Sequence, residues 1–166
     1  MDLTEFRQHK DELFSSPDSP LTPDQRPLFT GLKYWPANPS LRLTLPLDTN
    51  VDHDLVTMDT STGGQRRYVR AGKISFVVAG QTAELFLYSD EHGLFLPFRD
   101  ATCGQESYDA GRYLEPEQVK DGVVSVDFNL AYNPYCAFNE MYSCPIPPRE
   151  NWTGVRIEAG EKKFHE

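Results

Sequence analysis

The residues best suited to chemistry in this 166-residue chain lie in its second half. Arg99 and Arg112 each follow a turn signal, and a guanidinium group binds carboxylate or phosphate through two parallel hydrogen bonds. Asp100 and Asp127 have the chemistry of general bases, and Cys136 that of a nucleophile. The residue types therefore fit either an anion-binding site or a small hydrolase.

More polar side chains follow in a run with little helical or strand periodicity. Asp127 and Asn129 are predicted to share one face of a strand, because side chains alternate along a strand. A buried polar group without a partner costs about 1–3 kcal/mol, so this group either forms a satisfied internal network or lines a cavity. The candidate ligand-binding residues are Arg99, Asp100, Arg112, Tyr113, Asp127, Asn129, Tyr132, Asn133 and Cys136. They would meet where the loop after Phe98 approaches the 129–139 loop.

Structural roles compete with these assignments. Asp100 could cap the turn that follows it, while Arg99 pairs with a nearby carboxylate. Cys136 has no histidine near it in the sequence to lower its pKa, which favours a buried, inert thiol. Cys136 and Cys144 are close enough in one looped segment to approach each other.

Composition excludes several classes of protein. The net charge of −9 opposes binding to a nucleic-acid backbone. No run approaches the ~20 apolar residues that cross a bilayer, and no secretory signal is visible, so a cytoplasmic location is expected. Three cysteines and four scattered histidines offer no metal-ligand spacing, and the sequence points to no cofactor.

The expected architecture is mainly β. A helix is predicted over 2–14, with Asp2 and Glu5 in a capping pattern, and a second, short helix starts at Thr22. Strands are expected over 41–45, 55–60, 66–70, 73–78, 83–88, 94–98 and 123–128, with a short edge strand over 155–157. We therefore expect a single domain over 1–166. Helices over 1–30 would pack on an antiparallel, barrel-like sheet over 34–128, and a long loop region over 129–166 would wrap around it.

Several motifs together resemble a known family. They are the stretches 96–102, 110–114, 127–129, 131–137 and 159–162, with Tyr108, Cys144-Pro145 and, nearer the N-terminus, 19–21, 31–34 and 68–72. Over nearly the whole length the chain resembles an uncharacterised prokaryotic family, domain of unknown function 1684. Cys103 stands where a small residue such as serine is expected. The resemblance implies no catalytic residue, cofactor or partner.

Three functions remain open on this basis. The first is a domain that binds a small anionic or polar molecule in a pocket at one end of the sheet. The second is a hydrolase-like enzyme that uses Asp100, Asp127 or Cys136. The third is a structural or partner-binding module without a pocket; converging polar groups around a cavity of several hundred Å³ would argue against it.

Overall fold

The computed structural model describes residues 2–165 and shows a mainly β protein with one α-helix, α1 (Leu3–Ser15). This confirms the predicted fold class. The strands are β1 (Arg42–Pro46), β2 (Leu55–Asp59), β3 (Gln65–Val78), β4 (Gln81–Asp90), β5 (Gly93–Phe98), β6 (Arg112–Leu114), β7 (Glu117–Lys120) and β8 (Val123–Asp127).

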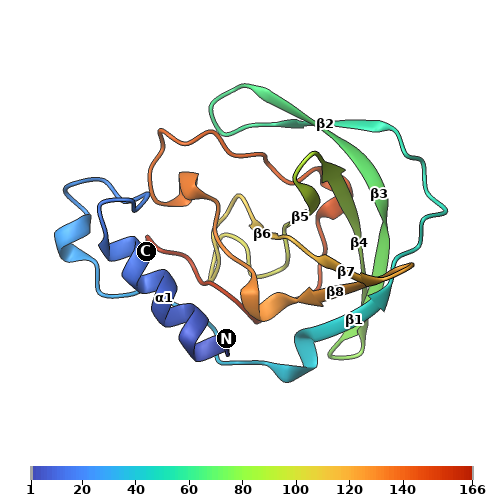
Figure 1. The fold of residues 1–166 in the computed structure, drawn as a ribbon, viewed down its shortest axis with the longest axis horizontal. Coiled ribbons are helices and arrows are strands. Elements are labelled where there is room, and N and C mark those ends of the chain that lie inside the picture. The colour runs from blue at the N-terminus through green and yellow to red at the C-terminus, as the bar shows by residue number, and fades with distance from the viewer. Residues whose placement is uncertain (1, 166) are drawn as a thin grey trace.

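The strands form two antiparallel sheets that curl into a half-barrel. Five strands pair in the order β2-β3-β4-β5-β6, and three pair in the order β1-β8-β7. In Figure 1 the sheets curve around one side of the molecule, and α1 lies across the other side. Because consecutive strands of the larger sheet are neighbours, short turns such as Ala79-Gly80 suffice to connect β2 through β5, whereas the longer segment 99–111 joins β5 to β6.

Gly72 joins the two sheets. A bulge between Arg70 and Gly72 bends β3, which is one strand where the sequence suggested two. A Cβ atom at Gly72 would lie 2.9 Å from the carbonyl oxygen of Asp48. Without it, the chain after β1 approaches β3 and forms the bridge between Asp48 and Lys73. The glycine therefore permits the close contact of backbones that closes this side of the half-barrel.

The hydrophobic core fills the concave side of the sheets. Alternate residues of β4, Ala83, Leu85 and Leu87, are fully buried and pack with Phe98 and Phe128. Each such large side chain contributes about 1.5–3 kcal/mol through its removal from water. The core thus follows the period-2 pattern expected of strands with one buried face.

Helix α1 begins and docks as its sequence indicates. The Asp2 carboxylate accepts a hydrogen bond from the Glu5 backbone N–H, and the Glu5 carboxylate accepts one from the Asp2 backbone N–H, so the predicted capping box is present. At the other end, the buried ring of Phe14 packs edge-on against Phe138, with centroids 4.9 Å apart. After Thr22 only a 3-10 turn forms, at Arg26–Leu28.

The predicted secondary structure differs from the structure in three further places. Residues 155–157 form no strand; Val155 and Ile157 instead pack into the main core. Strands β6 and β7 were not predicted, because β6 has three residues and β7 is exposed throughout. Asn129 lies in a 3-10 turn after β8, so it does not share a strand face with Asp127.

Candidate functional site

Two adjoining clefts open at the end of the half-barrel that faces α1. The inner cleft, of about 680 Å³, lies between α1 and the loop 134–145. The outer cleft, of about 770 Å³, lies between the start of β5 and residues 115–118. Five residues line both: Arg66, Tyr113, Glu115, Tyr132 and Pro145. Converging side chains around a space this large are typical of a small-molecule site.

Tyrosine and phenylalanine rings form much of the wall. Tyr113 and Tyr132 meet edge to face, with ring centroids 5.9 Å apart, and their backbones form an isolated antiparallel bridge. Tyr113 donates a hydrogen bond to the Pro145 carbonyl, and Tyr132 donates one to Glu115. Burial is the largest of the effects that raise the pKa of both phenol groups above the ordinary value. They therefore remain neutral hydrogen-bond donors at neutral pH.

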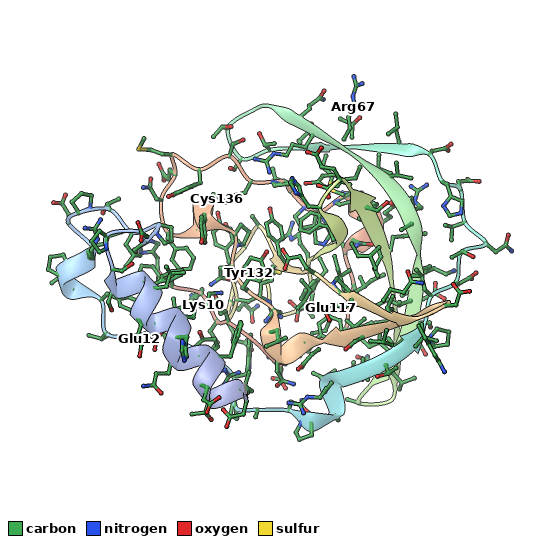
Figure 2. All side chains as sticks on the ribbon, in the orientation of Figure 1. Lys10, Glu12, Arg67, Glu117, Tyr132 and Cys136 are labelled. Carbon is green, nitrogen blue, oxygen red and sulfur yellow. The ribbon has the colours of Figure 1, made fainter. Side chains whose placement is uncertain are left out.

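Two cations border the inner cleft. The Nζ atom of Lys10 lies 4.7 Å from the Tyr132 ring centroid and pairs with the buried carboxylate of Glu161. In Figure 2 Lys10 points from α1 toward Tyr132, whereas Glu12 lies on the far side of the helix. The charge of Lys10 is therefore already balanced within the protein.

Arg66 is different. It lies opposite the buried Met58 in the register of β2 and β3, and two residues before the buried Tyr68. Its side chain therefore starts from the face of the strand that carries the buried cluster of Met58, Tyr68 and Tyr88, opposite to the face that lines the main core. Its Nη2 atom donates to the Ser143 carbonyl at 2.6 Å. Within residues 2–165 no carboxylate lies within ion-pairing distance of this guanidinium. Arg67, on the opposite face, projects outward into solvent (Figure 2).

Cys136 and Cys144 lie beneath the inner cleft in a small buried cluster with Tyr113. The Cys136 N–H donates to Sγ of Cys144 at 3.3 Å, and the Tyr108 hydroxyl lies 3.6 Å from Sγ of Cys136. The two cysteines do approach each other, and both are free thiols. Hydrogen bonding from Cys144, and then from Tyr108, lowers the pKa of Cys136 to about 6 although burial opposes this shift.

The two predicted anion-binding arginines do not share a pocket in this arrangement. The Arg112 guanidinium is fully buried, 3.4 Å from the Asp100 carboxylate, and donates to the carbonyls of Ile157, Ala159 and Glu161. Arg99 instead lies over the half-exposed ring of Trp152, 4.5 Å from its centroid. Arg112 therefore has the alternative, structural role: it pairs with a protein carboxylate and fixes a loop.

The other polar candidates hold the loops in place. Asp127 accepts hydrogen bonds from the backbone and side chain of Asn129, which in turn binds the backbone of Asn38. Asn133 donates its backbone N–H to Glu161 and its side-chain amide to the Lys162 carbonyl. These contacts form an internal network of the kind that the sequence left open, in which Oδ1 of the buried Asn133 has no hydrogen-bond partner among the described residues.

The predicted meeting of the loop after Phe98 with the 129–139 loop also exists. It forms a separate cleft of about 270 Å³, bordered by Tyr108, Ala137 and Phe164 among others. Of the nine candidate residues, only Tyr113 and Tyr132 line the inner and outer clefts, and Cys136 lies beside them.

Sequence reasoning missed Arg66, Lys10 and Glu115. Arg66 lies in the strand predicted over 66–70, where strand alternation already places Arg66 and Tyr68 on one face and Arg67 on the other. Lys10 follows Phe6 by four helical positions, which puts both on one side of α1. Glu115 carried no signal, because the β6 strand before it was not recognised.

The comparisons with known proteins identify the family. The model of the family described as protein of unknown function (DUF1684) matches residues 28–162, so the chain belongs to this family. It is similar to an uncharacterised protein of Haloarcula marismortui whose structure was solved by solution NMR, with 39% identity and a TM-score of 0.71. That match covers 96% of this chain and 91% of the other. No curated protein matches the chain.

Two further findings concern the described part of the chain. No helix there is long and apolar enough to span a membrane. Within residues 2–165, no group of three or more histidine, cysteine and acidic side chains is placed to hold a metal ion.

Proposed function

We propose that this protein binds a small molecule with an apolar, planar body and one anionic group in the cleft between α1 and the open end of the half-barrel. The observation that carries the proposal is Arg66. It lies where the two clefts adjoin, on the face of β3 that carries Tyr68, and no carboxylate among the described residues lies within ion-pairing distance of it. A bound carboxylate or phosphate would supply that partner.

The surroundings fix where each part of the ligand would lie. The outer cleft contains the carboxylates of Asp90, Glu115 and Glu117, which repel an anion. The inner cleft has one carboxylate, Glu115, together with Lys10 and Arg66, and its lining is mostly aromatic and apolar. The body of the ligand would therefore pack against the tyrosines of the inner cleft, with its anionic group directed toward Arg66.

The hydrolase alternative has less support. Asp100 accepts hydrogen bonds from Thr102 and from the Ile157 N–H besides its pairing with Arg112. Asp127 is bound to Asn129 and lies 3.4 Å from Arg42. Neither carboxylate borders the inner or the outer cleft, so we assign no reaction to them.

Isothermal titration calorimetry of the full chain tests the proposal. The probes are 3-phenylpropionate and its amide, which differ in charge but hardly in shape. We expect the acid to bind more tightly than the amide, and Arg66→Met to weaken binding of the acid by roughly tenfold or more, because a hydrogen bond to a charged group contributes about 1.5–3 kcal/mol. Arg67→Met is the matched control and should bind as the wild type does.

Three outcomes would contradict the proposal. One is binding of neither probe. Another is equal affinity for acid and amide. The third is an equal loss of affinity in the Arg66 and Arg67 variants. This result would show that Arg66 affects binding only through the net charge of the protein.

A further inference from the structure

Cys136 and Cys144 form a pair of thiols in a segment of the chain that already brings them together. Cys136 lies in the 3-10 turn Tyr135–Ala137, and Cys144 follows eight residues later. The Cys136 N–H lies within hydrogen-bond distance of Sγ of Cys144, at 3.3 Å. Ser61 holds Cys144 from the other side through a hydrogen bond from the Cys144 N–H to the Ser61 hydroxyl, at 3.1 Å.

The surroundings of the two sulfur atoms are unequal. The neighbouring Cys144 thiol, and then the Tyr108 hydroxyl 3.6 Å from Sγ of Cys136, lower the pKa of Cys136. The pKa of Cys144 is raised, first because its thiol donates to Cys136 and then because of burial. This inequality favours the thiolate at Cys136 and the proton at Cys144, which is the division of roles between an attacking and a resolving thiol.

Access is narrow. The two residues are 9% and 8% exposed, and Cys144 borders the inner cleft. A bulky reagent has little contact with either sulfur atom, whereas a molecule of two heavy atoms such as hydrogen peroxide needs no more room than two waters. The burial therefore selects for a small oxidant and against large thiol reagents.

We propose that Cys136 and Cys144 form a two-thiol reaction site that reduces a small hydroperoxide and closes a disulfide bond between them. The Cys136 thiolate attacks the nearer peroxide oxygen; the O–O bond breaks, and the leaving hydroxide or alkoxide takes the proton of Cys144. The sulfur atom of Cys144 then attacks the sulfenic acid at Cys136. The hydroxide that leaves in this second step takes a proton from solvent and becomes water.

The electrons and protons of this single turnover balance without a further reagent. Two thiols lose two electrons and two protons in total, the peroxide gains them, and the products are one disulfide, one water and one alcohol, or a second water when the oxidant is hydrogen peroxide. The reaction does not depend on the proposed binding of an anionic ligand.

Cys103 provides an internal control. Its pKa is raised, first by burial and then by the charge of Asp100. It lies beside Asp100 and Ser107 rather than beside another cysteine. It should therefore stay reduced while the pair reacts.

The test uses the full chain, reduced and then exposed to hydrogen peroxide at pH 6, with intact-mass and peptide mass spectrometry. We expect the loss of two hydrogen atoms, a Cys136–Cys144 cross-linked peptide and a free thiol at Cys103. The reaction should be roughly fivefold or more faster in the folded chain than in the urea-unfolded chain. The gain in thiolate fraction exceeds the loss of nucleophilicity that accompanies a lower pKa.

Two variants separate the steps. In Cys144→Ser the sulfenic acid should persist and be trapped by dimedone at Cys136, whereas Cys136→Ser should show no oxidation at Cys144. Oxidation first at Cys103, or a disulfide that forms no faster in the folded wild-type chain than in urea, would overturn the proposal, and this comparison needs no variant to fold.

Discussion

The Nη2 atom of Arg112 lies 3.4 Å from Oδ2 of Asp100, and neither side chain exposes surface to solvent. The same guanidinium donates to three carbonyls of the C-terminal segment, at Ile157, Ala159 and Glu161. The rings of Trp35 and Phe98 flank it at 5.0 and 5.2 Å. One buried cation thus ties β6, the loop after β5 and the chain end into one unit.

Removal of the Asp100 charge should therefore destabilise the fold. Asp100→Asn keeps the shape of the side chain but leaves Arg112 buried without a counter-charge, a change that costs about 3–5 kcal/mol. Urea denaturation should show a lower free energy of unfolding with an unchanged slope. Glu158→Gln, in the same segment but exposed and paired with Arg156, is the control and should leave the midpoint close to wild type. Equal midpoints for both variants would rule out a structural role for the Asp100–Arg112 pair.

Gly160 gives a second stability prediction. Its φ is +81°, and a Cβ atom there would lie 2.6 Å from the Ala131 carbonyl oxygen and 2.8 Å from that of Phe128. Gly160→Ala therefore adds a steric clash to the backbone strain, and we expect a loss of about 3 kcal/mol or more. Gly122→Ala is the matched control, because its φ is +71° with open space around it. It should lose only about 1–2 kcal/mol. Similar thermal melting points for the two variants would contradict the close packing at Gly160.

The titration of Cys136 gives a prediction about pH. The ultraviolet absorbance of the thiolate, measured in Cys103→Ser, should rise with a midpoint near pH 6, because the lowered pKa leaves Cys136 protonated below that pH and ionised above it. Cys144→Ala in the same background removes the main hydrogen-bond donor, so the midpoint should move up toward the ordinary value of about 8.5. A first transition above pH 8 in both proteins would show that Cys144 does not stabilise the thiolate.

The fold could be predicted where patterns among neighbouring residues determine it. It could not be predicted where a contact between distant residues determines it. Alternation marked the long strands, and the capping residues Asp2 and Glu5 marked α1, because both signals arise within a few neighbouring residues. Val155 and Ile157 alternate as a strand does, yet they pack into the core as coil. The backbone of this segment is instead held in part by the side chain of Arg112, a contact across 45 residues for Ile157 that no local pattern encodes.

The candidate site was predictable only in part for the same reason. Tyr113 and Tyr132 were identified because aromatic and polar residues cluster around them, and they line the clefts. Arg99 and Arg112 looked equivalent in the sequence, but the register that pairs Phe98 with Arg112 leaves one guanidinium inside the protein and the other over Trp152. Cys136 was expected to be inert because no histidine is near it in the sequence. Its approach to Cys144 was foreseen, but the Tyr108 hydroxyl, 28 residues away, was not recognised as a neighbour.

Chemical-shift mapping by NMR tests the central claim, ligand binding in the inner cleft, most directly. Titration of the labelled chain with 3-phenylpropionate should shift the signals of Arg66, Tyr113 and Tyr132 together, with one dissociation constant. The surface around Arg99 and Trp152, which also carries arginine and an aromatic ring, should stay unchanged. Shifts confined to Arg99 and Trp152, or no saturable shift in the cleft, would contradict the account.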